Sequence, residues 1–315
     1  MVTKPAASQP MFTNAALRQL IIPLILEQLL AMTVGLAAVV MITSVGEAAV
    51  SGVSLVDSLN VLIISILSAL CTGGAVVCAQ SIGRQQPENA RLSAKQLVYV
   101  SLIFSVAIGA VLLVAPQFFI RLIFGALDPA VAESARVYLI FSAISFPFLA
   151  LYNACAALFR AMGNSRISLY VSLVMNVVNI SLNALFLYGL HLGVLGVSIA
   201  TAVARAVAAV LMLVLIQSKS NVIYLQNLFP IRFEKNMVRS ILSIGVPNGL
   251  ENGMFNFSKL LVQTLVAWLG TSAIAANAII GSIFNITIVP GMGMSLAILT
   301  VVGQCVGAVD YRQVT

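Results

Sequence analysis

The sequence predicts an all-α polytopic membrane protein made of two six-helix bundles in a parallel repeat, the second of them incomplete. Of 315 residues, 61% are apolar and only 8% are charged, whereas a soluble domain typically carries about 25% charged residues. The mean hydropathy is +1.08, and the apolar runs are long enough for a helix to cross about 30 Å of hydrocarbon. A transmembrane barrel is excluded, because its strands would be short and alternating.

Eight membrane spans are expected where apolar runs are separated by charged or turn residues. Their approximate bounds are 17–43, 48–82, 94–116, 135–159, 166–189, 194–217, 238–268 and 273–307. The second and eighth spans exceed one bilayer crossing, so we expect them to tilt, bend or project from the membrane. The segment Pro290-Gly291-Met292-Gly293 predicts a bend inside the eighth span.

The order of the spans predicts the domain organisation. The first apolar run is too long for a cleavable signal peptide, so we expect the first span to remain in the membrane. The predicted parts are a cytoplasmic N-terminal segment (1–16), an N-lobe of six helices (17–217), a cytoplasmic linker (218–237) and the first two helices of a C-lobe (238–315).

Lysine and arginine residues fall mostly on one side of the predicted membrane. Twelve of the 16 lie in the N-terminal segment, in even-numbered loops or after the last span, whereas odd-numbered loops hold only Arg121 and Arg136. Cytoplasmic loops are enriched in these residues. We therefore expect a multi-pass protein of the plasma or bacterial inner membrane with a cytoplasmic N-terminus.

A shift of 224 residues superimposes the beginning of the chain on its end without a gap. The pairs that carry this repeat are Pro23 with Pro247, Glu27 with Glu251, Gly46 with Gly270, Ala49 with Ala273, Gln80 with Gln304, and Gly83 with Gly307. Repeated bundles are typical of transporters. The second copy begins after an even number of spans, so the repeat is parallel, and it ends before the counterparts of the third to sixth helices. We expect a C-terminally truncated fragment.

Several functional classes find no support in the residues. The net charge of +7 comes from scattered loop residues, which does not predict a nucleic-acid partner. The four cysteines lie in apolar stretches with no CxxC pair, so neither a metal site nor a disulfide framework is indicated. His191 is the only histidine and no GxSxG motif occurs, so we expect no enzyme and no cofactor.

The chain resembles the multidrug and toxic-compound extrusion (MATE) family over its whole length. The resemblance is clearest in the segments IPLILEQLLAMTVGL (22–36), VGEAAVSGVSLVDSLN (45–60), CTGGAVVCAQSIG (71–83), FRAMGNSRIS (159–168), MNVVNISLNALFLYG (175–189), GVPNGLENGMFNFSKLLV (245–262) and VGQCVGA (302–308). It implies a twelve-helix, two-lobed exporter of organic compounds, cationic or amphipathic, in antiport with Na⁺ or H⁺. One departure is Ala38, which stands where members of the family often carry a first-helix aspartate.

Ionisable residues inside a membrane are functional candidates because each costs about 2.5–3.5 kcal/mol on insertion scales. Such residues are Glu27, Asp57, Arg205, Glu251 and Lys259. Glu251 is the principal candidate for binding the coupling ion or proton, since it follows the bend-prone segment Pro247-Asn248-Gly249 and matches a coupling glutamate of the family. Glu27 is its counterpart in the first lobe. The alternative for both is a structural carboxylate bonded to neighbouring groups.

Polar residues are expected to line a cavity in each lobe. Asn176, Asn179 and Asn183 share one helical face, which predicts either a cavity wall or hydrogen bonds between helices. The resemblance places Asn153, Asn179 and Asn183 at N-lobe site positions, and Asn252 and Asn256 accompany Glu251. Apolar candidates for the cavity lining are Met254, Phe255 and Met292, although such residues more often only pack.

Three functions remain open at this stage. The first is efflux of organic compounds by a monomer whose partners are a small-molecule substrate and the lipid bilayer. The second is a lipid-linked oligosaccharide flippase of the same broad superfamily, which would require a more basic cavity than Arg205 and Lys259 provide. The third is an inactive truncated fragment.

Overall fold

The computed structural model describes residues 12–125, 127–225, 232–268 and 271–310. Within these ranges the chain is helical, with no strand. The helices are α1 (Asn14–Thr43), α2 (Glu47–Gly83), α3 (Pro87–Val114), α4 (Pro116–Phe124), α5 (Pro129–Ala161), α6 (Ser165–Ala184) with the π-helical turn η1 (Leu185–Gly189), α7 (Gly193–Ile216), α8 (Lys235–Trp268) and α9 (Thr271–Gly307). Most of the predicted N-terminal segment, together with Gly270 and Arg312, lies outside the described residues.

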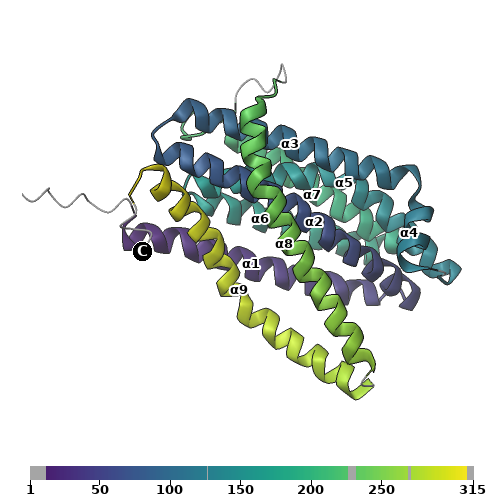
Figure 1. Ribbon diagram of the computed structural model, residues 1–315. Coiled ribbons are helices and arrows are strands. Elements are labelled where there is room, and N and C mark those ends of the chain that lie inside the picture. Colours follow the sequence, from purple (N-terminus) through teal and green to yellow (C-terminus); the bar gives the residue numbers. More distant parts are fainter. Residues whose placement is uncertain (1–11, 126, 226–231, 269–270, 311–315) are drawn as a thin grey trace, which may run out of the picture.

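Seven helices of the described chain are long and apolar enough to cross a membrane. The predicted seventh span corresponds to α8, which has 34 residues and carries Asn248, Glu251 and Asn252 within its apolar sequence. The predicted fold class, an all-α polytopic membrane protein, is confirmed. Within α9, Pro290 lies inside a continuous helix that changes direction midway, as the sequence predicted (Figure 1).

Helix ends differ from the predicted spans because helices continue beyond the hydrocarbon. Proline occupies the first turn of α3, α4 and α5, where its missing N–H is not needed. α3 therefore begins at Pro87 and α5 at Pro129, six or seven residues before the predicted spans. The short α4 was not predicted at all. It packs against α5 at the end of the bundle.

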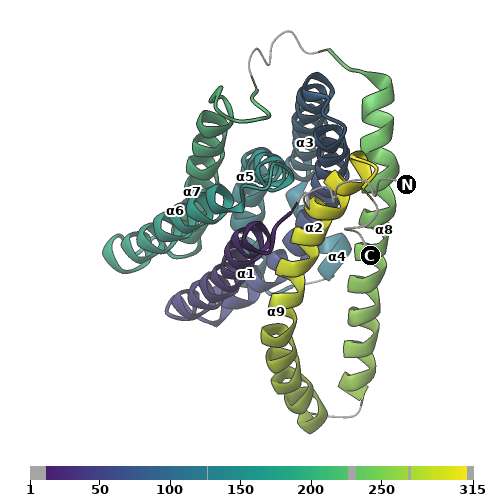
Figure 2. The ribbon, with the colours of Figure 1, turned by 90° about the vertical axis from the view of Figure 1, so that its left-hand side faces the viewer.

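The helices α2 and α5 form the centre of the N-lobe. They contact each other, and α5 also packs against α3 and α7. Alanine and cysteine residues such as Ala154, Cys155 and Cys78 are fully buried there, which allows the helix backbones to approach closely. The ribbon views show α8 and α9 along one side of this bundle, with α6 and α7 on the opposite side (Figures 1 and 2).

The two lobes meet through reciprocal contacts between residues that the 224-residue shift relates. A Cβ atom at Gly83 would overlap the carbonyl oxygen of Gln304, and a Cβ atom at Gly307 would overlap that of Gln80. A Cβ atom at Gly303 would lie 2.8 Å from the Cβ of Ala79, its own counterpart. Reciprocal contacts of this kind are the mark of a two-fold axis, which therefore passes between α2 and α9.

Contacts farther from the axis obey the same symmetry. Gly293 in α9 lies against Ile25 in α1, and the counterparts of these residues, Ala69 and Gly249, contact each other between α2 and α8. Accordingly α1 packs against α9 and α2 packs against α8. We call this four-helix interface the seam. It joins the N-lobe to the first two helices of the C-lobe.

Candidate functional site: a polar cavity in the N-lobe

A cavity of about 250 Å³ lies inside the N-lobe, between α1, α2, α5, α6 and α7. Its polar lining residues come from four of these helices: Ser54, Asp57, Tyr138, Asn176, Asn179, Thr201 and Arg205. Ala38 contributes to the wall formed by α1. The cavity therefore combines a carboxylate, a guanidinium group and several uncharged hydrogen-bonding groups among helices that are long and apolar enough to cross a membrane.

Asp57 and Arg205 are held by residues of α2 and α5. The hydroxyl group of Tyr138 donates a 2.9 Å hydrogen bond to Oδ1 of Asp57, and Nδ2 of Asn60 donates a second of 3.3 Å to the same oxygen. Nη1 of Arg205 donates a 2.7 Å bond to Oγ of Ser145. Asn60 also donates to Ser142 at 3.2 Å. These contacts fix both charged groups at the cavity wall.

The predicted asparagine stripe of α6 is divided between the cavity and the protein interior. Asn176 and Asn179 line the cavity, whereas Asn183 is buried and donates a 3.0 Å bond to Oδ1 of Asn179. Asn179 in turn donates to Thr201 at 3.4 Å. Asn153 is half-buried on α5 and is not among the residues that line this cavity. The structure thus brings together two of the four predicted N-lobe asparagines at the cavity.

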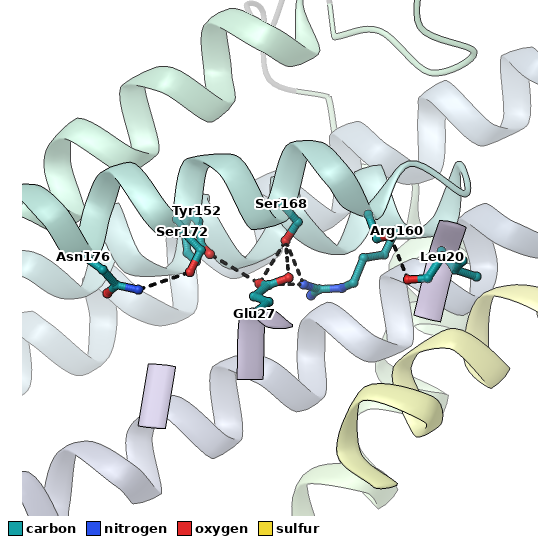
Figure 3. Close-up of polar contacts among 8 residues, drawn as sticks. Leu20, Glu27, Tyr152, Arg160, Ser168, Ser172 and Asn176 are labelled. Atoms are coloured by element: carbon teal, nitrogen blue, oxygen red, sulfur yellow. Dashed lines mark hydrogen bonds and ion pairs between the residues drawn. The ribbon is translucent and has the colours of Figure 1, made fainter. Parts of the chain in front are cut away.

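Glu27 lies in a separate polar cluster between α1, α5 and α6 (Figure 3). Its side chain is largely buried and forms an ion pair of 3.5 Å with Nη1 of Arg160. Oγ of Ser168 lies 2.9 Å from both carboxylate oxygens, and the hydroxyl group of Tyr152 donates at 3.5 Å. These partners come from helices distant in the sequence, and they satisfy the carboxylate without a ligand.

The C-terminal end of α5 also connects the two lobes. Thr300 of α9 donates a 3.1 Å hydrogen bond to the carbonyl oxygen of Arg160, and Gln304 donates one of 2.6 Å to the carbonyl oxygen of Ala161. Arg160 therefore contacts Glu27 through its side chain and the C-lobe through its backbone. The Glu27 cluster is thus tied to the seam.

Glu251 and its neighbours lie on the exposed face of α8. Glu251, Met254 and Phe255 are exposed, and so is Met292 of α9. Asn252 donates a 3.0 Å bond to Asn248, and Asn256 is half-buried. Nζ of Lys259 lies 4.8 Å from the centre of the Phe255 ring. Among the described residues none forms a hydrogen bond or ion pair with Glu251.

Two residues of these sites, Arg160 and Asp57, were not predicted to lie where the structure places them. Arg160 counted only as a cytoplasmic loop residue, because it stands at a span boundary, but it pairs with Glu27. Asp57 was named without a partner; its spacing to Asn60 on one helical face is the one signal that could have placed it in a polar cluster. In the described part of the chain, no group of three His, Cys, Asp or Glu side chains could hold a metal ion.

Two lobes that meet around a two-fold axis, with a polar cavity at membrane depth, define a membrane transporter of the repeated-bundle class. The chain belongs to the MATE family, whose MatE model matches residues 23–185 and 247–315. The matched segments include Glu27, the cavity residues of α2 and α6, and Glu251.

Related proteins and solved structures agree with this assignment. The chain is 26% identical over 312 residues to the uncharacterized transporter YisQ of Bacillus subtilis, covering 97% of this chain and 68% of that protein. It is 26% identical over 293 residues to the probable multidrug resistance protein NorM of Thermotoga maritima, covering 91% and 62%. A crystal structure of MATE in the bent conformation shares the fold, with a TM-score of 0.88 and 22% identity over 95% of this chain and 66% of that one. The chain thus spans about two thirds of the length of its relatives.

Proposed function

We propose that the protein is a secondary transporter that exports organic compounds, cationic or amphipathic, in antiport with Na⁺ or H⁺. The observation that carries this proposal is the symmetric seam, because two bundles related by an axis along the membrane normal can rock around a central cavity. The names of relatives, which include probable multidrug resistance proteins, support organic compounds as substrates. Among the described residues lining the N-lobe cavity, Arg205 is the one basic side chain, which does not favour the flippase alternative.

Glu251 is the coupling residue in this mechanism. It is a carboxylate within α8, so it can exchange a cation or a proton when the lobes change orientation. Glu27, its counterpart, is held by Arg160 and Ser168. It can exchange a cation or a proton only when these contacts at the end of α5 break. Coupling therefore operates chiefly through the C-lobe.

Glu251→Gln is expected to reduce efflux of ethidium from cells by roughly tenfold or more, since glutamine cannot take up a proton or hold a cation by charge. The measurement is intracellular ethidium fluorescence in cells producing the 315-residue chain, beside the same chain extended with the last four helices of a relative. The matched control is Glu234→Gln, an exposed glutamate just before α8. Equal efflux by Glu251→Gln, Glu234→Gln and the unsubstituted chain would contradict the coupling role. If neither the unsubstituted 315-residue chain nor its extended form exported ethidium, transport of this probe would be refuted.

The topology gives a second prediction. All four native cysteines are buried, so a membrane-impermeant maleimide should react only with a cysteine introduced at an exposed site. With a cytoplasmic N-terminus, His191→Cys is labelled in intact cells, whereas Lys219→Cys is labelled only after the cells are opened. The reverse pattern would invert the proposed orientation. Labelling of both sites in intact cells would show that the two loops share one side of the membrane.

A further inference from the structure

The N-lobe cavity contains two opposite charges that do not neutralise each other by direct contact. Asp57 of α2 and Arg205 of α7 both line the cavity, yet in the described chain they form no ion pair with each other. Arg205 stands near the middle of α7 (Gly193–Ile216), where an uncompensated charge costs about 2.5–3.5 kcal/mol on insertion scales. Such residues usually pair with one another or face a polar cavity.

Most hydrogen-bond donors of Arg205 have no partner within the described chain. A guanidinium group has five N–H donors, and one bond, from Nη1 to Ser145, is the only hydrogen bond that this side chain forms within the described chain. None of its nitrogen atoms is both buried and unpaired. Arg205 lines the cavity, and the planar arrangement of its remaining donors matches a carboxylate or another oxyanion.

Asp57 presents a free acceptor in the same way. Both of its hydrogen bonds, from Tyr138 and Asn60, end on Oδ1. Within the described chain Oδ2 accepts no bond, and it is not among the buried unpaired atoms. An ionised carboxylate accepts bonds at both oxygens. Oδ2 therefore suits the N–H groups of an ammonium or a guanidinium ligand.

The rest of the cavity limits the size and character of the ligand. Its volume of about 250 Å³ is below the range of about 300–1,000 Å³ that is usual for drug-sized ligands. Asn176, Asn179 and Thr201 supply uncharged hydrogen-bonding groups, while Val34, Ala38 and Met175 are apolar. A compact molecule with a short apolar segment between two charged ends fits this lining.

We propose that the N-lobe cavity binds a small zwitterion, whose carboxylate or other anionic group contacts Arg205 and whose cationic amine contacts Asp57. Transport of such a molecule rests on the proposed function, but binding to the cavity does not. A simple organic cation satisfies Asp57 and leaves Arg205 without an anionic partner. A simple anion satisfies Arg205 and leaves Asp57 without a cationic partner. The cavity therefore favours a molecule that carries both charges.

The test compares three probes that share one skeleton: 4-aminobutanoate, butylamine and butanoate. Binding is measured by isothermal titration calorimetry on the purified chain in lipid nanodiscs. We expect 4-aminobutanoate to bind roughly 10- to 100-fold more tightly than either singly charged probe, the factor expected for one further hydrogen-bonded charged contact. Arg205→Met should reduce its affinity to that of butylamine, and Asp57→Asn should reduce it to that of butanoate.

Two controls separate a lost contact from a lost fold. Arg136→Met removes an arginine that pairs with Glu133 outside the cavity, and it should leave the affinity for 4-aminobutanoate unchanged. Ser145→Ala removes the neutral partner of Arg205 and keeps the charge, so zwitterion selectivity should persist. Equal affinity for all three probes, no binding of 4-aminobutanoate, or an unchanged preference in Arg205→Met would overturn the proposal. Selective binding without ethidium efflux would instead count against the proposed function alone.

Discussion

Arg160→Met is expected to lower the free energy of unfolding by about 3–5 kcal/mol, because it leaves the Glu27 carboxylate buried without its cationic partner. Glu27 and Arg160 are 3.5 Å apart, and their side chains retain only 9% and 16% of their exposure. Ser168 and Tyr152 would remain as neutral donors, and they compensate a buried negative charge only in part. Denaturant titration of the purified chain in detergent micelles measures the loss.

Substitution of the other partner, Glu27→Gln, should lower the free energy of unfolding by less. In Glu27→Gln the remaining charge belongs to Arg160, which stands near the end of α5 (Pro129–Ala161) and can extend its long side chain toward water. The double variant Glu27→Gln/Arg160→Met should recover much of the stability lost in Arg160→Met, since removal of both partners of a buried pair is often nearly neutral. Additive losses in the double variant would show that the two side chains are not coupled.

Gly83→Ala and Gly307→Ala are each expected to destabilise the seam by at least about 3 kcal/mol, the upper end for overpacking of a core. A Cβ atom at either position would overlap a backbone carbonyl oxygen of the opposite lobe. Backbone atoms of a helix cannot change rotamer to make room, so α2 and α9 would have to separate. Unfolding titrations of the two variants measure the effect.

Gly253→Ala provides the matched control for the seam glycines. It also lies inside a helix of the C-lobe, but a Cβ atom there would meet no other group within 4 Å among the described residues. Alanine is favoured over glycine in a helix by about 0.5–1 kcal/mol, so this variant should be unchanged or slightly more stable. If Gly83→Ala and Gly253→Ala had the same free energy of unfolding, the close contact between α2 and α9 would be contradicted.

The fold could be predicted from the sequence because the bilayer imposes it. Runs of about 20 apolar residues leave the backbone no alternative to a helix, and the internal repeat in the sequence already pairs Gly83 with Gly307. Helix ends and the short α4 could not be predicted. The length of an apolar run gives the part of a helix that lies in the membrane, and helices continue beyond it. Pro87 and Pro129 begin helices outside the predicted spans, and Pro116 begins α4 at the last residue of one.

The site could be predicted only where its residues share a helix. The periodicity of α6 placed Asn176 and Asn179 on one face, and both line the cavity. The pairing of Glu27 with Arg160 and the common cavity of Asp57 and Arg205 depend on how distant helices pack. Helical periodicity contains no information about that packing. The roles of Glu251, Asn252 and Asn256 stay predictions.

Rocking of the two lobes about the seam is the central claim, and distance measurements on both sides of the membrane test it most directly. Spin labels at Leu190 and Leu265 report one end of the lobes, and labels at Lys219 and Val309 report the other; all four residues are exposed. Electron–electron double resonance in lipid nanodiscs, with and without ethidium, should show one distance lengthening while the other shortens. Distances that stay constant, or that change in the same direction at both ends, would contradict alternating access in this protein.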